Sequence, residues 1–445
     1  MKRIVLFGLM VLGLVAFAGC SKDKPGETTK AVTAGKTENQ FVPEDYEPGN
    51  RTKYLSPMMK TDKGLYYYSF ADKGIHYYDL ATQKTMFLCN KPECRHGGSE
   101  FCVATNGKYL TLSQCKYNDV ILAFVLEETD TQYLFKVLSI ALDGSEMDEV
   151  ATVLELDKTT DDFSIYQCFM YAHRNKVFLT FTGSGQVETE YHGTAVLDLN
   201  TKKTTFLDEE PFSKDNVAVS DVSGYGDYFY YCKKEGKKLL LHRYHIENGT
   251  DESFRLLTNF SGQYVLLDED TIAYIRSAGT VICTHQISTG HNTEHTKIMR
   301  YAYWYKWQEK TFIRYDEKSE SEVVQLLTDG TYVYAPEIYR EYRDTDENGE
   351  EIVVRREGYI HVYNQALEEI ALVNMAEAAA SLGFDDMEWS EKSYTQMLHY
   401  LGEEIYWKLI PKGTTDSEKY VFRCNRSDFI AGKPKFEYVY QYSGY

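Results

Sequence analysis

Three cysteines and one histidine lie close together in the first quarter of this sequence. Cys89, Cys94, His96 and Cys102 follow the pattern C-x4-C-x-H-x5-C. Thiolate sulfur and imidazole nitrogen are preferred ligands of Zn²⁺, and a structural zinc site uses four of them in a tetrahedron. The same spacing allows one disulfide bond among the three cysteines, with His96 left on the surface, or three reduced thiols. The sequence leaves these three interpretations open.

Other cysteine chemistry fits this segment less well. A c-type haem attachment motif places histidine directly after the second cysteine, whereas Arg95 occupies that position. Pro92 and the pair Gly97-Gly98 allow the tight turns that a metal site or a disulfide needs. No local motif supports a nucleophilic cysteine. The pattern therefore favours a metal site, a disulfide or reduced thiols over a haem site or a catalytic cysteine.

A second ligand-like segment contains Asp344, Asp346 and Asn348, followed by Gly349, and it matches the start of an EF-hand calcium loop. The twelfth position of such a loop needs an acidic ligand, and here it is Arg355. Asn-Gly between two strand-like runs is typical of a hairpin turn. We interpret residues 332–363 as a charged β-ribbon and not as a calcium site.

An aromatic group formed by Trp304, Tyr305 and Trp307 is a candidate ligand-binding element. Aromatic rings stack on sugars and cradle peptides, although inside a sheet they serve as core. This group falls in a stretch, 298–327, where the strand rhythm is irregular and where either an elongated hairpin or a poor sheet is expected. That placement favours the binding role.

The N-terminal segment has the form of a secretory signal. Lys2 and Arg3 precede an apolar run from Ile4 to about Ala18, which is too short for a comfortable membrane span. The tetrapeptide Phe-Ala-Gly-Cys that ends at Cys20 resembles the lipobox of bacterial lipoproteins. The resemblance implies cleavage after residue 19 and lipid, such as palmitate, on Cys20, which would anchor the chain to the outer face of a membrane.

Residues 20–52 are predicted to be a disordered tether, because they have too few large apolar side chains to repay the entropy of ordering. A flexible segment of this length reaches on the order of 30 Å. The chain has 48 basic and 67 acidic residues, and removing residues 1–19 changes its net charge from −19 to −21, because Lys2 and Arg3 are lost. Such a charge disfavours nucleic acid as a partner.

From residue 53 to 445 the sequence repeats short strands and polar turns. Strands that open each repeat are expected near residues 55, 110, 166, 219, 264, 327 and 397, and such a period is typical of a β-propeller. Many strands, such as 120–126 and 227–231, are apolar on both faces, as expected for sheets stacked between two neighbours. We therefore predict an all-β fold with one propeller of seven blades, with six or eight as alternatives. A helix capped by Asn374 and ended by Gly383 should link the last two blades.

Two turns, DLATQKT at 79–85 and DLNTKKT at 198–204, resemble the "D-L-x-T-G-K" turn of TolB-like and quinoprotein-like propellers. In this chain Gln83 and Lys202 replace the glycine. With the signal segment, these features resemble the propeller lipoproteins of Gram-positive bacteria, in which stretches similar to the Cys89–Cys102 pattern recur. The resemblance implies a fold and a location, not an activity.

No sialidase Asp-box and no G-x-S-x-G motif is present in the sequence. We expect a non-enzymatic, membrane-anchored lipoprotein whose propeller binds a glycan, a peptide or an envelope protein. One alternative is a glycoside hydrolase or lyase on extracellular carbohydrate, which would need two facing carboxylates. The other is a scaffold or sensor subunit of an envelope complex. The only cofactor predicted is a possible structural zinc ion at the cysteine and histidine cluster.

Overall fold

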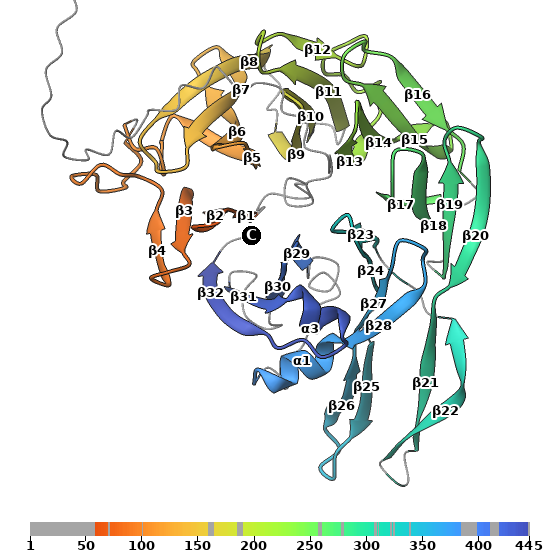
Figure 1. Ribbon diagram of the computed structural model, residues 1–445. Helices are drawn as coiled ribbons and strands as arrows, with labels where there is room; N and C mark the ends of the chain where they lie inside the picture. The colour runs from red at the N-terminus through yellow and green to blue at the C-terminus, as the bar shows by residue number, and fades with distance from the viewer. Residues whose placement is uncertain are drawn as a thin grey trace, which may run out of the picture. The chain divides into compact units, whose positions relative to one another are not determined.

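The computed structural model contains seven four-stranded antiparallel sheets, which form the ring of blades in Figure 1. It describes residues 58–443 except 70–71, 100, 159–163, 185–189, 257–259, 277–279, 307–308, 310, 321–322, 324, 338–339, 384–397 and 410–417. The signal segment, Cys20 and the predicted tether lie outside the described residues. The predicted all-β propeller with seven blades is confirmed.

Blades 1 to 4 are each built from four consecutive strands. They contain β1 (Met59–Lys60), β2 (Gly64–Ser69), β3 (Gly74–Asp79) and β4 (Lys84–Phe87); β5 (Tyr109–Tyr117), β6 (Val120–Glu128), β7 (Gln132–Ala141) and β8 (Met147–Asp157); β9 (Ser164–His173), β10 (Lys176–Ser184), β11 (Glu190–Asp198) and β12 (Thr204–Phe206); and β13 (Val219–Tyr225), β14 (Tyr228–Glu235), β15 (Lys238–His245) and β16 (Asp251–Phe254).

Among the described residues, blades 5 to 7 follow the same plan with two additional ribbons and two helices. They contain β17 (Phe260–Leu266), β18 (Thr271–Arg276), β19 (Val281–Gln286) and β20 (His291–Lys297); β23 (Leu327–Thr328), β24 (Val333–Pro336), β27 (Tyr359–Tyr363) and β28 (Glu369–Asn374); and β29 (Leu398–Leu401), β30 (Glu404–Leu409), β31 (Glu418–Asn425) and β32 (Glu437–Ser443). The ribbons are β21 (Met299–Lys306) with β22 (Thr311–Glu320) and β25 (Arg340–Thr345) with β26 (Glu351–Glu357), and the helices are α1 (Met375–Ser381) and α3 (Arg426–Ile430).

Seven clusters of buried apolar side chains hold the ring together, one at each junction between neighbouring blades. The two-residue period of a strand sends alternate side chains to opposite junctions. In β2, Tyr66 and Tyr68 belong to the junction with blade 2, whereas Leu65 and Tyr67 belong to the junction with blade 7. This alternation explains why the blade strands are apolar on both faces.

The ring closes between blade 7 and blade 1 through side chains, because among the described residues blade 7 contains only strands from the C-terminal part of the chain. Tyr67 stacks on Tyr440 with ring centroids 4.9 Å apart. The Lys60 ammonium lies 2.6 Å from a Glu404 carboxylate oxygen. Residues separated by 344 positions are thus paired at the seam.

Both ribbons lie outside the four-stranded sheets and extend away from the ring in Figure 1. The stretch 298–327, predicted to be either a hairpin or a poor blade, contains the hairpin β21–β22. The predicted ribbon around Asn348-Gly349 is the hairpin β25–β26, inserted between the second and third strands of blade 6. Helix α1 has the predicted Asn374 cap, whose side chain accepts hydrogen bonds from the N–H groups of Ala376 and Glu377. No helix among the described residues is both long and apolar enough to span a membrane.

The turn between the third and fourth strands repeats with the same backbone geometry in several blades. In blade 1, the Gln83 N–H donates to the Asp79 carbonyl, and in blade 3 the Lys202 N–H donates to the Asp198 carbonyl. Gln83 and Lys202 have φ values of 56° and 59°, and the equivalent residue in blade 5 is Gly290, at 68°. The two non-glycine residues therefore sit in the left-handed region that glycine prefers.

Replacing Gln83 or Lys202 by glycine should stabilise the protein by roughly 1 kcal/mol per site, because a side chain makes the left-handed conformation costly by about 1–2 kcal/mol. Glycine's greater freedom in the unfolded chain offsets part of this gain. Both side chains are exposed, so little else is lost. The midpoint of urea unfolding measures the change. As the matched control, Gly290→Ala, in open surroundings, should lower the midpoint, and a lower midpoint for Gln83→Gly would contradict the expected strain.

Candidate metal centre

The Cys/His cluster lies in the loop that connects blade 1 to blade 2, between the end of β4 and the start of β5. Both ends of this loop are fixed to one residue of β3. The Leu88 N–H donates to the Ile75 carbonyl, and the Ile75 N–H donates to the Ala104 carbonyl, each at 2.9 Å. Leu88, Cys102, Val103 and Ala104 are buried in the junction between the two blades. The loop is therefore part of the core at both ends.

A turn of blade 2 packs against the first half of the loop. The Asn90 N–H points to the Gly144 carbonyl at 3.4 Å. A Cβ atom on Gly144 would lie 2.7 Å from both the Leu88 carbonyl oxygen and the Cys89 nitrogen, so only glycine fits this approach. Cys89 is thereby held close to the β7–β8 turn.

The second half of the loop folds back on itself. A Cβ atom on Gly107 would lie 2.3 Å from the Gly98 carbonyl oxygen, which shows how closely the two backbone segments cross. The Gly98 N–H points to the Thr105 hydroxyl at 3.4 Å. His96 has a φ of 51°, a left-handed conformation that turns the chain toward the cysteines. These crossings bring Cys94, His96 and Cys102 to one place.

One ligand atom from each of Cys89, Cys94, His96 and Cys102 lies within 4.8 Å of all the others. The Cys102 sulfur is 3.5 Å from His96 Nδ1. Bond lengths of about 2.3 Å for zinc–sulfur and about 2.0–2.1 Å for zinc–nitrogen put sulfur and nitrogen about 3.6 Å apart in a tetrahedron. The four residues thus fit a metal ion, and all eight described cysteines are free thiols.

The four ligand positions differ in their exposure. Cys102 is completely buried, whereas Cys89, Cys94 and His96 are half-buried. Burial raises the pKa of Cys102, but hydrogen bonds from Thr105 and His96 outweigh it and lower that pKa to about 6. The Thr105 hydroxyl and N–H point to the Cys102 sulfur at 3.2 and 3.4 Å. A thiolate, the form that binds metal, is therefore favoured at this position.

Thr105 was absent from the predicted site, and its role depends on a contact that only the folded loop creates. Replacing it by valine should raise the pKa of Cys102 above 6 in metal-free protein, because the valine side chain cannot donate a hydrogen bond to the sulfur. Ultraviolet thiolate absorbance against pH measures the shift. Thr105→Ser keeps the hydroxyl and should titrate as the parent does, whereas an unchanged curve for Thr105→Val would refute the role.

The other predicted ligand residues do not join this cluster. Asp344, Asp346 and Asn348 lie at the end of the β25–β26 hairpin. The Asp346 carboxylate accepts hydrogen bonds from the N–H groups of Asn348 and Glu350, both at 2.8 Å. This carboxylate therefore stabilises the turn. Among the described residues, the group of side chains close enough to hold a metal ion does not include it.

Trp304 and Tyr305 belong to β21, close to the end of a ribbon that pairs with no blade. In the ribbon's register Trp304 lies opposite Ile313 and Tyr305 lies opposite Phe312. Trp307 lies outside the described residues. The two described aromatic residues and the Cys/His cluster therefore belong to different parts of the fold, a two-stranded ribbon and the loop between blades 1 and 2.

A buried histidine recurs on the third strand of three blades, three residues before the start of the turn. His76, His242 and His361 are 8%, 5% and 0% exposed. Each contacts a carboxylate: Asp72 at 2.9 Å, Asp251 at 3.1 Å and Glu369 at 2.7 Å, respectively. The sequence signal for these positions is the short pattern H-x-Y, which occurs at 76–78, 242–244 and 361–363. Each of the three side chains is buried and lies beside one carboxylate of its own blade.

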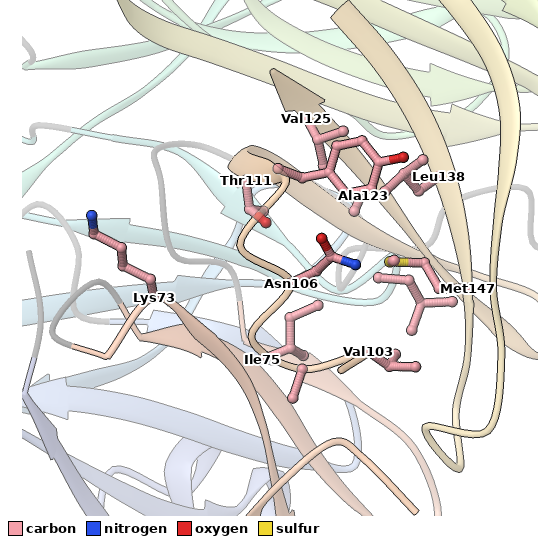
Figure 2. Close-up of a pocket in the computed structure, with 12 residues that line it drawn as sticks. Lys73, Ile75, Val103, Asn106, Thr111, Ala123, Val125, Leu138 and Met147 are labelled. Carbon is pink, nitrogen blue, oxygen red and sulfur yellow. The ribbon is translucent and has the colours of Figure 1, made fainter. Parts of the chain in front are cut away.

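A small pocket lies beside the loop that carries the Cys/His cluster, at the junction of blades 1 and 2 (Figure 2). Val103 and Asn106 of the loop line it together with Ile75 of β3 and Met147 of β8. Its walls are mostly apolar, and Lys73 is their one charged residue. The pocket extends the junction core and offers no further group of metal ligands.

These observations define a seven-bladed β-propeller whose first interblade loop carries a Cys3His cluster. No protein-family model and no curated protein matches the chain. The solved structures similar to it include an oligogalacturonate lyase in complex with manganese, with a TM-score of 0.40 and 10% identity over 89% of this chain and 98% of that chain.

Two further similar structures are more distant in sequence or in shape. An uncharacterized protein from Listeria monocytogenes has a TM-score of 0.44 and 7% identity over 76% of this chain and 85% of that chain. A putative TolB from Agrobacterium tumefaciens has a TM-score of 0.32 and 12% identity over 68% of this chain and 89% of that chain. These likenesses concern the fold alone.

Proposed function

We propose that this chain is an extracytoplasmic lipoprotein, anchored to the cell membrane by lipid on Cys20, whose propeller binds a glycan, a peptide or an envelope protein without transforming it. The sequence supports the location: residues 1–19 have the form of a lipoprotein signal, and residues 20–52 have the composition of a tether. An anchored protein of this kind works within a few tens of ångströms of its membrane.

The observation that carries the binding role is the placement of Trp304 and Tyr305 on a ribbon outside the blades. Strands within a blade are covered by a neighbouring sheet on each face, and their aromatic residues fill the junctions. The ribbon β21–β22 is a separate two-stranded sheet and belongs to no blade. A position outside the blades supports a role of these aromatic residues as contacts for a ligand.

The soluble fragment from Thr52 onward should bind a component of the cell envelope, and the double variant Trp304→Ala/Tyr305→Ala should weaken that binding about 30-fold. Loss of two contact aromatics costs roughly 2 kcal/mol or more at a binding hot spot. A glycan array and a pulldown from envelope extract identify the ligand, and calorimetry measures the affinity. Tyr438→Ala, at an exposed aromatic residue of blade 7, is the control and should bind as the parent does.

Two results would contradict this proposal. Unchanged affinity in the double variant would remove the ribbon from the binding site. Cleavage of a bound polymer would replace the binding role by the alternative one, a glycoside hydrolase or lyase, and would direct attention to facing carboxylates.

We also propose that the Cys/His cluster holds one structural Zn²⁺. Its support is the convergence of three sulfurs and one imidazole nitrogen within 4.8 Å of one another. Four protein ligands would fill the tetrahedral coordination of zinc and leave no open position for a substrate. When bound, the ion would cross-link the two halves of the loop between blades 1 and 2. The role is structural because the set supplies all four ligands of a closed tetrahedral site.

Protein purified without chelator should contain one zinc per chain, and Cys94→Ser should reduce that content to well below one equivalent. Removing the metal should also lower the melting temperature, because a ligand that binds the folded state stabilises it. Elemental analysis and calorimetry are the measurements. Cys168→Ser changes a buried thiol in blade 3 and should keep the zinc, and parent protein lacking zinc after reconstitution would refute the site.

A further inference from the structure

We propose that Cys89 and Cys94 form an oxidation site: a peroxide converts these two thiolates into a disulfide, and the metal ion leaves the cluster. This inference rests on the proposed zinc site and states how that site is regulated. It rests on the unequal exposure of the three sulfurs and on their mutual distances.

Exposure separates the cysteines into a pair and a single residue. Cys89 and Cys94 are half-buried, so an oxidant in solution can reach them. Cys102 is completely buried, and its neighbours Val103 and Ala104 belong to the core between blades 1 and 2. Thr105 points two donors at the Cys102 sulfur and holds it in place. Oxidation is therefore expected at the pair, with Cys102 as a spectator.

The pair can form a disulfide with a local movement. Its sulfurs lie within 4.8 Å of each other, and an S–S bond of about 2.05 Å requires them to approach by less than about 3 Å. The intervening chain is a turn closed by the Cys94 N–H to the Lys91 carbonyl at 3.1 Å, and Pro92 and Glu93 in it are exposed. The Cys102 sulfur lies within the same 4.8 Å of both partners, so its burial beside Val103 and Ala104, and not its distance, sets it apart from the pair.

The chemistry balances with a peroxide as the oxidant. One thiolate of the pair attacks a peroxide oxygen, the O–O bond breaks, and the oxygen that leaves takes a proton to become water. The second thiolate attacks the resulting sulfenic sulfur, the S–O bond breaks, and the departing hydroxide takes a proton to become a second water. The two sulfurs lose two electrons, and hydrogen peroxide gains them.

The metal loses two of its four ligands in this step. Cys102 and His96 alone, 3.5 Å apart, do not make a closed zinc site. The blades should keep their arrangement, because the hydrogen bonds from the Leu88 N–H to the Ile75 carbonyl and from the Ile75 N–H to the Ala104 carbonyl do not involve the cluster. The response is therefore expected to stay within the loop.

Zinc release and disulfide mapping test the proposal together. Zinc-loaded full chain is treated with hydrogen peroxide, released zinc is followed with a chelating dye, and alkylated tryptic peptides are analysed by mass spectrometry. Trypsin does not cleave the Lys91-Pro92 bond, so residues 85–95 carry both Cys89 and Cys94, and residues 96–108 carry Cys102. We expect one zinc released per disulfide, and peptide 85–95 lighter by two hydrogens with no alkyl label.

Matched variants separate this inference from the zinc proposal. His96→Asn changes a half-buried ligand, and asparagine tolerates the left-handed φ at that position. It should lack zinc yet still form the Cys89–Cys94 disulfide. Cys89→Ser should lose both zinc and the disulfide. The thiols of Cys115, Cys168 and Cys232, buried elsewhere, should stay reactive toward alkylation only after unfolding.

The outcomes are distinguishable. Parent protein that never holds zinc refutes the zinc proposal, whatever its disulfides. Parent protein that holds zinc but keeps it after peroxide treatment, or that joins peptide 85–95 to peptide 96–108, overturns the oxidation site and leaves the zinc proposal standing.

Discussion

Every blade of this propeller must bury both of its faces, and the rest of the structure depends on that constraint. A sheet placed between two others has no solvent side, so each strand supplies apolar side chains to two junctions at once. In blade 7, Ile405 and Trp407 serve the junction with blade 6, while Tyr406 between them serves the junction with blade 1. The large tyrosine content meets this demand, because a phenol ring fills a junction and keeps a polar tip for the rim.

The Cys/His loop draws its rigidity from the same constraint. Its two ends lie in the junction of blades 1 and 2, and the cluster is held above them by hydrogen bonds to Ile75 and by the approach of Gly144. The ligand atoms can therefore meet without a large ordering cost at the moment of binding. The two ribbons differ from this loop, because they are separate two-stranded sheets outside the blades. Their residues need not supply apolar side chains to two blade junctions.

Much of the fold could be predicted because the signals are local. The strands that open blades 4 and 6 begin at Val219 and Leu327, as predicted, and the remaining five begin within four residues of the expected positions. The Asn374 cap and the Asn-Gly turn depend only on near neighbours. The ring-closing pair Lys60 and Glu404 depends on contacts between distant residues, which periodicity does not show.

The candidate site divides in the same way. The spacing of Cys89, Cys94, His96 and Cys102 predicted that they could share one centre, and the fold brings their ligand atoms together. The donors of Thr105, and the difference in exposure between Cys102 and the other two cysteines, arise from how the loop lies against the blades. A pattern of residue types cannot supply that information, because it does not show which side chains the fold buries.

The closure of the ring by side chains alone has a mechanical consequence. Blade 1 is the first blade of the chain, so a pull on the residues that precede Met58 acts on it before any other blade. On one side it is held to blade 7 by side chains alone, namely a buried apolar cluster with stacked tyrosine rings and the Lys60–Glu404 ion pair, with no shared strand among the described residues. On the other side it is joined to blade 2 by the continuous chain of the Cys/His loop. Under load the ring should open between blades 7 and 1, with the Cys/His loop between blades 1 and 2 as its hinge.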